Sequence, residues 1–204
     1  MKALILVDIQ NDFCPGGALA VPKGDEVVLI ANSLTAQFPL VVATQDWHPV
    51  NHGSFAANHP GASPYQMSDL AGLPQVLWPV HCVQNTSGAA FHPDLDARGI
   101  AKVFPKGTDS TIDSYSGFFD NGRRKSTGLG EFLREQQVDA VAILGLATDY
   151  CVRATAMDAL SMGLDVTLVT DGCRAVDLKL GDGERALADL REAGARLLTA
   201  REID

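Results

Sequence analysis

The sequence predicts an α/β protein built on a doubly wound, mainly parallel six-stranded sheet with helices on both faces. Short continuous apolar runs, such as Ala3 to Val7, are typical of strands that are buried on both faces of a parallel sheet. Stretches with apolar residues at helical spacing alternate with these runs along the chain. This alternation is typical of strand–helix–strand units, which place their strands in parallel.

The periodicity predicts six strands and about four helices within a single domain that spans residues 1–204. The strands are expected at residues 3–7, 40–44, 99–104, 140–144, 165–170 and 196–199. The helices are expected at residues 25–38, 128–136, from Thr148 or Asp149 to Gly163, and 183–193. Thr148 or Asp149 is expected to cap the third helix, and Asp171-Gly172 is expected to turn the chain after the fifth strand.

The composition excludes several classes of partner. With 16 basic and 25 acidic residues, the net charge of −9 argues against binding to nucleic acid or to an anionic membrane. The apolar first segment is interrupted by Asp8 and lacks a cleavage-site pattern, which predicts a strand rather than a signal peptide. We therefore expect a cytoplasmic location, in which Cys14, Cys82, Cys151 and Cys173 are reduced thiols. No nucleotide-binding glycine motif is present, so no nucleotide cofactor is expected.

Cys151 lies where a predicted strand passes into a helix, and this position suits a nucleophile. Free backbone N–H groups and the positive end of the helix dipole favour a thiolate there. The same N–H groups could stabilise an oxyanion. The alternative is that Cys151 is a small buried hydrophobic residue, which is the commoner role of a cysteine.

Asp8 and Lys106 also lie at the carboxyl ends of predicted strands, so they are expected to converge with Cys151 at one edge of the sheet. The carboxylate would take the thiol proton and return it to a leaving amine, while the lysine would stabilise negative charge. Such a set hydrolyses a carboxamide through a thioester. The alternatives are that Asp8 caps the segment that follows it, or that the two residues form an ordinary surface ion pair.

The segment from Asp46 to His81 has no sustained periodicity, and loops of this length in compact domains are usually functional or disordered. It carries Asp46, His48, His52 and His81, which are ligands suited to one Zn²⁺, Fe²⁺ or Mn²⁺ ion. We predict a metal-binding loop at about residues 46–81. The alternative is that these polar residues only form local hydrogen bonds.

Six segments match one known family in order and with compatible spacing. They are VDIQNDFCPGGAL, TQDWHPVNHGSF, WPVHCVQNTSGAAFHP, FPKG, YSGF and GLATDYCV. On these motifs the chain resembles the nicotinamidases, which are isochorismatase-like cysteine hydrolases, over essentially its whole length. The resemblance implies the isochorismatase-like hydrolase fold and a catalytic triad of Cys151, Asp8 and Lys106.

The resemblance also implies the binding residues. A metal would be held by Asp46, His48 and His81, with His52 as a fourth ligand in some members. The oxyanion hole would use the backbone N–H groups of Ala147 and Cys151, and the peptide bond between Leu146 and Ala147 would be cis. The substrate-binding residues would be Phe13, Trp78, Tyr115 and Leu146, with the pyridine ring stacked on Phe13 and Trp78 and its nitrogen facing the metal.

The activity that the resemblance implies is hydrolysis of nicotinamide to nicotinate and ammonia in NAD salvage, with pyrazinamide as a further substrate. The metal would anchor the ring nitrogen or also activate the deacylating water, and the sequence leaves both open. One alternative is another amidase of the superfamily, acting on carbamoyl or ureido compounds. Another is a non-enzymatic metal-binding or redox-sensing protein. The sequence does not indicate whether the protein is a monomer or a homo-oligomer.

Overall fold

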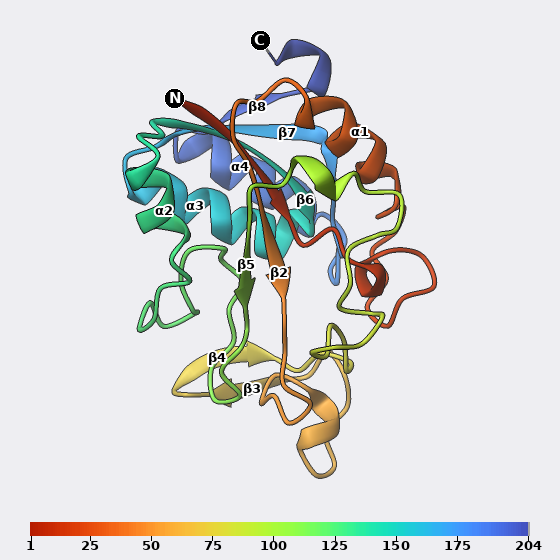
Figure 1. The fold of residues 1–204 in the computed structure, drawn as a ribbon. Coiled ribbons are helices and arrows are strands. Elements are labelled where there is room, and N and C mark those ends of the chain that lie inside the picture. Colours follow the sequence, from red (N-terminus) through yellow and green to blue (C-terminus); the bar gives the residue numbers. More distant parts are fainter. Residues whose placement is uncertain (204) are drawn as a thin grey trace.

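The computed structural model describes residues 1–203 and is organised around one six-stranded sheet (Figure 1). The strands are β1 (Lys2–Val7), β2 (Val41–Asp46), β5 (Lys102–Lys106), β6 (Ala140–Leu146), β7 (Asp165–Arg174) and β8 (Arg196–Leu198). Their order across the sheet is β5-β2-β1-β6-β7-β8, and every neighbouring pair is parallel. The predicted parallel sheet is therefore confirmed.

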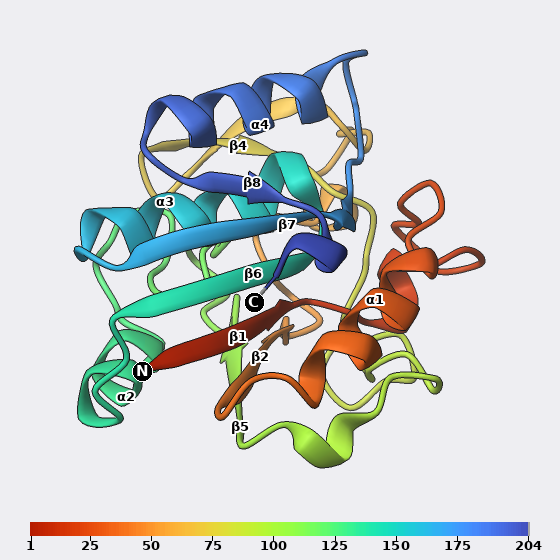
Figure 2. The same cartoon turned by 90° about the horizontal axis from the view of Figure 1, so that it is seen from above.

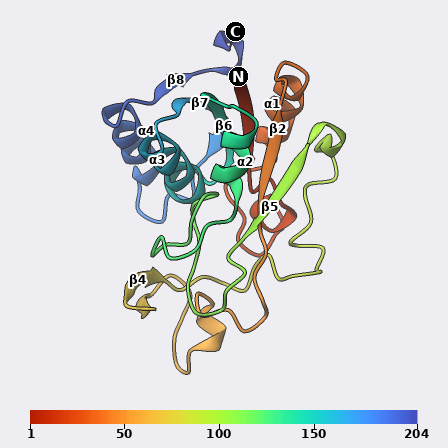
Figure 3. The same ribbon diagram turned by 60° about the vertical axis from the view of Figure 1, so that its left-hand side comes forward.

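Helices cover both faces of this sheet, as predicted. The α-helices are α1 (Glu26–Thr35), α2 (Leu129–Glu135), α3 (Arg153–Ser161) and α4 (Asp182–Glu192). Short helical turns are η1 (Asn11–Phe13), η2 (Ala56–Asn58), η3 (Ala97–Gly99), η4 (Thr148–Val152) and η5 (Ala200–Glu202). Figure 3 shows α1 on one side of the sheet and α3 and α4 on the other. Within residues 1–203, none of these helices has the length and apolar character needed to cross a bilayer.

The strand order reverses between β1 and β6, which lie side by side in the middle of the sheet (Figure 2). From β1 the chain moves outward through β2 to β5, whereas from β6 it moves the other way through β7 to β8. In open α/β sheets, ligands bind beside the carboxyl ends of the strands at such a reversal. The topology alone therefore places a binding crevice at the ends of β1 and β6.

The β1 strand is the most deeply buried part of the core. All residues from Ala3 to Val7 are at most 1% exposed, because β2 and β6 flank the strand and helices cover the sheet. Side chains on both faces of β1 are thus removed from water. This burial explains why the strand is an unbroken apolar run and does not alternate between apolar and polar residues.

Several predicted boundaries were wrong. The third strand, predicted at residues 99–104, is β5 at Lys102–Lys106, because residues 97–99 form the turn η3 before it. The first helix ends at Thr35 and not at residue 38, because the chain tightens into a turn in which the Gln37 N–H donates to the Leu34 carbonyl at 2.8 Å. Strand β7 does not turn at Asp171-Gly172 but continues to Arg174. A register shift between β6 and β7 lets the ends of both strands keep pairing.

The prediction that Thr148 or Asp149 caps the third helix was also wrong. The segment begins with a π-helical turn, η4, and no side chain caps it. The Asp149 carboxylate instead accepts hydrogen bonds from the N–H groups of Val176 and Asp177, at 3.0 and 2.8 Å. This contact ties the turn after β6 to the chain that follows β7.

The segment 46–81, expected to be irregular, contains the antiparallel hairpin of β3 (Met67–Leu70) and β4 (Leu73–Val76). The hairpin lies beyond the carboxyl ends of β2 and β5 in Figure 1. It does not extend the main sheet. Apolar residues alternate too little along its two four-residue strands for a sequence pattern to identify them.

Gly145 provides a test of how tightly β6 and β1 pack. Its φ is +130°, and a Cβ atom at this position would lie 2.0 Å from the Val7 carbonyl oxygen. We expect Gly145→Ala to lower the free energy of unfolding by about 3 kcal/mol, because it combines backbone strain with a main-chain clash. The melting temperature would fall by roughly 6–12 °C in a thermal denaturation experiment.

Gly163→Ala is the matched control. Gly163 also has a positive φ, +82°, but no atom lies within 4 Å of the position its Cβ would take. This substitution adds only the left-handed backbone penalty of about 1 kcal/mol. Equal losses of stability in the two variants would show that the contact between β6 and β1 is not tight.

Candidate active site

The Lys106 ammonium is the centre of a buried cluster of charged and polar groups. Its Nζ atom lies 2.9 Å from Asp8 Oδ2, and it donates hydrogen bonds to the Ser114 carbonyl at 2.9 Å and to Cys151 Sγ at 3.4 Å. It also donates to Asp46 Oδ1 in a short ion pair. Lys106 is only 2% exposed. The structure therefore brings Asp8, Lys106 and Cys151 together, as the strand-end argument expects.

Four strand ends supply these groups. Lys106 and Asp46 are the last residues of β5 and β2, and they face each other in the parallel register of these strands. Asp8 follows β1 directly, and Cys151 lies in η4, just after β6. Asp8 has a left-handed backbone, with φ of +49°, and its Oδ1 atom accepts a hydrogen bond from Thr44 Oγ1 at 2.6 Å.

Burial and neighbouring charges shift the pKa values of the two carboxylates in opposite directions. Burial opposes charge on both, but the ammonium of Lys106 and the ring of His48 hold the pKa of Asp46 well below its ordinary value. Burial of Asp8 favours its neutral form more than the Lys106 cation favours its charged form. The negative charge of Asp46 acts in the same direction as burial, so the pKa of Asp8 is raised. Asp46 is thus a stable anion, whereas Asp8 is the better proton acceptor.

The expectation that helix position and Lys106 make Cys151 a thiolate needs correction. Burial and the carboxylates of Asp8 and Asp46 raise the pKa of the Cys151 thiol well above its ordinary value, and the lowering by Lys106 does not offset them. The resting group is therefore a thiol. A thiol proton beside a basic carboxylate suits general-base activation rather than a preformed ion pair.

Asp46, His48 and His81 form a compact donor set. Asp46 Oδ2 lies 3.5 Å from His48 Nε2 and 3.8 Å from His81 Nε2, and the candidate donor atoms all lie within 4.8 Å of one another. The Nδ1 atoms of the two rings pair with the carbonyls of Gly107 and Pro79, at 2.9 and 2.8 Å. A ring that donates from Nδ1 keeps its Nε2 lone pair for a cation.

His52 does not join this set directly. Its ring lies beside His48, with centroids 4.3 Å apart, and it groups with His48 and Asp113. Burial and the neighbouring His48 lower the pKa of His52 to about 4, so the ring is neutral at pH 7. Its buried Nε2 has no hydrogen-bond partner among residues 1–203. An orphaned imidazole nitrogen beside the His48 imidazole and the Asp113 carboxylate fits a divalent transition metal.

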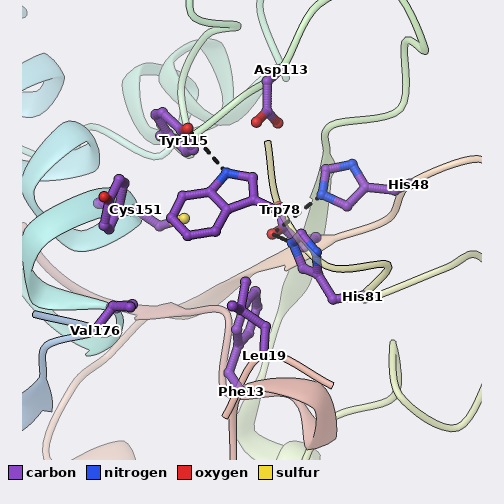
Figure 4. A pocket seen from close by; sticks show the side chains of 12 residues that line it. Phe13, Leu19, His48, Trp78, His81, Asp113, Tyr115, Cys151 and Val176 are labelled. Carbon is purple, nitrogen blue, oxygen red and sulfur yellow. Dashed lines mark hydrogen bonds and ion pairs between the residues drawn. The ribbon is translucent and has the colours of Figure 1, made fainter. Parts of the chain in front are cut away.

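A cavity lies between Cys151 and the histidines. Figure 4 shows Cys151 entering from the side of α3, while His48 and His81 enter from the opposite side. Phe13 and Trp78 contribute aromatic walls, and the Trp78 indole N–H donates to the Tyr115 hydroxyl at 3.1 Å. The cavity has the apolar lining and few polar groups typical of a site for a small aromatic molecule.

Leu146, by contrast, is fully buried and does not line the cavity. The peptide bond between Leu146 and Ala147 is cis, as the resemblance implies. Ala147 itself lines the cavity beside Cys151.

Four lining residues were not identified from the sequence. They are Leu19, Asp113, Tyr150 and Val176. Asp113 is buried in an irregular loop and accepts a hydrogen bond from Gln75 Nε2 at 2.8 Å, a contact that no local pattern signals. Val176 follows the end of β7, but this strand was predicted to end at residue 170, so Val176 was not expected at the sheet edge.

Comparison with known proteins places this geometry in a family. The Isochorismatase domain model matches residues 2–202. A nicotinamidase of Escherichia coli (strain K12) is 52% identical over 202 residues, which cover 97% of this chain and 94% of the relative.

Two solved structures are also similar. A nicotinamidase and pyrazinamidase of Acinetobacter baumanii has a TM-score of 0.96 and 43% identity, over 98% of this chain and 97% of that one. A pyrazinamidase of Pyrococcus horikoshii, solved in complex with zinc, has a TM-score of 0.79 and 40% identity, over 97% of this chain and 98% of that one. Because the match extends over nearly the entire chain in sequence and in fold, this protein belongs to the isochorismatase family.

Proposed function

We propose that this protein is a nicotinamidase, which hydrolyses nicotinamide to nicotinate and ammonia, and that pyrazinamide is a second substrate. The observation that carries the proposal is the aromatic cavity with a thiol, a carboxylate and an ammonium at one end and two imidazole nitrogens at the other. A pyridine-3-carboxamide has an amide and a ring nitrogen on opposite sides of a flat ring. The names of the close relatives support the same substrate.

The acylation step follows from the proposed roles. The Asp8 carboxylate accepts the Cys151 proton as the sulfur attacks the amide carbon, and the oxyanion takes hydrogen bonds from the N–H groups of Ala147 and Cys151. Protonated Asp8 then gives its proton to the departing nitrogen, so that ammonia leaves and a thioester remains. Lys106 stabilises the negative charge that moves between sulfur and carboxylate.

Deacylation uses the same groups in reverse order. Asp8 takes a proton from water as the water oxygen attacks the thioester carbon, and the resulting oxyanion occupies the same hole. Its collapse breaks the carbon–sulfur bond, the sulfur recovers a proton from Asp8, and nicotinate leaves. The sum of the two steps is amide plus water giving acid plus ammonia.

Asp46, His48 and His81 would hold one divalent transition metal, such as zinc, with His52 as a further ligand. Such an ion would supply a Lewis-acid anchor for the ring nitrogen. Phe13 and Trp78 would stack on the two faces of the ring, and Tyr115 would fix the Trp78 indole. We further propose that residues 1–204 act as one domain in the NAD salvage pathway of the cytoplasm, where the four free thiols remain reduced.

Replacing the nucleophile tests the proposal most directly. We expect Cys151→Ala to reduce ammonia release from nicotinamide by at least about 10⁴-fold, because no thioester can form. The assay should include pyrazinamide and a carbamoyl compound, since preference for the carbamoyl compound would indicate the other amidase class.

Cys173→Ala is the matched control, because it removes another buried cysteine that lies outside the cavity. It should retain activity on nicotinamide. Equal activity in Cys151→Ala and the unmodified protein would rule out the thioester route.

The protonation state of Cys151 gives a pH prediction. Since burial raises the pKa of this thiol, its alkylation by iodoacetamide should keep accelerating as the pH rises past the ordinary thiol value of 9.0. Lys106→Met should move the profile to still higher pH, because Lys106 lowers the pKa of the thiol. Mass spectrometry of the Cys151 peptide provides the rate, and a plateau below pH 9.0 would contradict the assignment.

Metal removal tests the histidine cluster. Treatment with a chelator should reduce activity on nicotinamide at least about tenfold, and zinc should restore it. Elemental analysis of the untreated protein should find about one transition metal ion per chain. Full activity in protein that contains no metal would exclude the proposed anchor.

His48 and His52 are expected to differ in their effect on metal binding. His48→Ala removes a nitrogen that faces Asp46, so zinc affinity, measured by competition with a chromophoric chelator, should fall by more than about 100-fold. His52 lies outside the Asp46 set, so His52→Ala should cost about tenfold or less. The reverse ranking would make His52 the principal ligand.

A further inference from the structure

Tyr150 stands between the cavity and a second, larger space. A groove lies on the outer side of the ring, between the β3–β4 hairpin and the start of α4. Residues of the hairpin (Met67 and Val76) and of α4 (Asp182, Arg185, Ala186 and Asp189) line this groove together, and Figure 2 draws the hairpin behind α4. Among the described residues, Tyr150 is the one whose side chain lines both spaces. Its ring is therefore the partition between them.

Ring packing holds this partition in place. The Tyr150 ring meets Trp78 edge to face, with centroids 4.8 Å apart, and lies 5.5 Å from the Tyr115 ring. No described residue forms a hydrogen bond with the Tyr150 hydroxyl. Asp149 and Asp182, whose charges act on that hydroxyl, both line the groove. Because the ring is held by packing against Trp78 and Tyr115, the barrier between the two spaces is steric.

The groove suits an uncharged group. Tyr65, Met67 and Leu178 present apolar surface there, with 50%, 65% and 37% of their area exposed. One of the basic groups that line it is already neutralised, because Arg153 Nη2 lies 2.8 Å from an Asp189 carboxylate oxygen. Apolar groups that enter the groove would cover this exposed apolar surface, and two of its three cations are already paired, Arg153 with Asp189 and Arg185 with Asp182.

We propose that Tyr150 sets the size limit for the ring of the carboxamide substrate, by closing the cavity against this groove. The inference rests on the proposed function. With Tyr150 in place, a ring that carries a bulky substituent on the groove side cannot enter. A small side chain at position 150 would join the two spaces, and the substituent would lie along Tyr65, Met67 and Leu178.

The test compares nicotinamide with nicotinamides that carry a single propyl group at each free ring carbon in turn. The measured quantity is kcat/KM for each substituted amide divided by kcat/KM for nicotinamide. In Tyr150→Ala this ratio should rise at least about tenfold for one or more positions, because a few methylene groups gain space. Tyr150→Phe is the matched control: it keeps the ring, so its ratios should equal those of the unmodified protein.

Two further variants make the outcome decisive. Tyr150→Val is assayed in the same way if thermal denaturation shows that Tyr150→Ala does not fold. Adding Leu178→Glu to Tyr150→Ala places a charge in the groove and should reduce the gained ratio. The proposal is overturned if no ratio rises in the small-residue variants, if Tyr150→Phe shows the same rise, or if Leu178→Glu leaves the gain unchanged.

Failure of the proposed function is recognised separately. If the unmodified protein releases no ammonia from nicotinamide, the function is wrong whatever the variants do. Calorimetric binding of nicotinate and of its propyl derivatives then tests the partition without turnover. The derivatives should bind Tyr150→Ala at least about tenfold more tightly, relative to nicotinate, than they bind the unmodified protein.

Discussion

The buried ammonium of Lys106 is the interaction on which the site depends. Asp8 and Asp46 lie within reach of the same cation, and all three groups are removed from water. Two neighbouring carboxylates without that cation would repel each other in a medium that solvates them poorly, and breaking a buried pair costs about 3–5 kcal/mol. The parallel register of β2 with β5, which sets Asp46 opposite Lys106, therefore provides both electrostatic balance and site geometry.

Asp46 links the two ends of the cavity. One carboxylate oxygen contacts Lys106, and the other faces the Nε2 atoms of His48 and His81. A single rigid strand end thus fixes the distance between the proposed nucleophile region and the proposed metal site. A substrate that must contact both ends has to match that distance, so recognition of ring nitrogen and amide together follows from the position of one side chain.

Local sequence patterns predicted the sheet and the strand-end residues, because continuous apolar runs directly report burial on both faces. They could not predict that Lys106 pairs with Asp46 as well as Asp8, since that contact depends on β5 lying beside β2. Asp113 was missed for a similar reason: Gln75, which is 38 residues away in the chain, holds it in place. The thiol pKa also depends on total burial, which the helix-end argument omits.

The sheet and the loops supply different parts of the site, so these parts can change independently. The charged groups lie on strand ends fixed by register, whereas the aromatic walls come from loops and turns. Tyr150 is adjacent to Cys151 in the same turn, yet its ring packs against Trp78 and Tyr115, while the Cys151 sulfur accepts a hydrogen bond from Lys106. Side chains at position 150 can therefore vary in size without disturbing the buried charges. The size of the cavity and the reacting groups can thus change independently of each other in this fold.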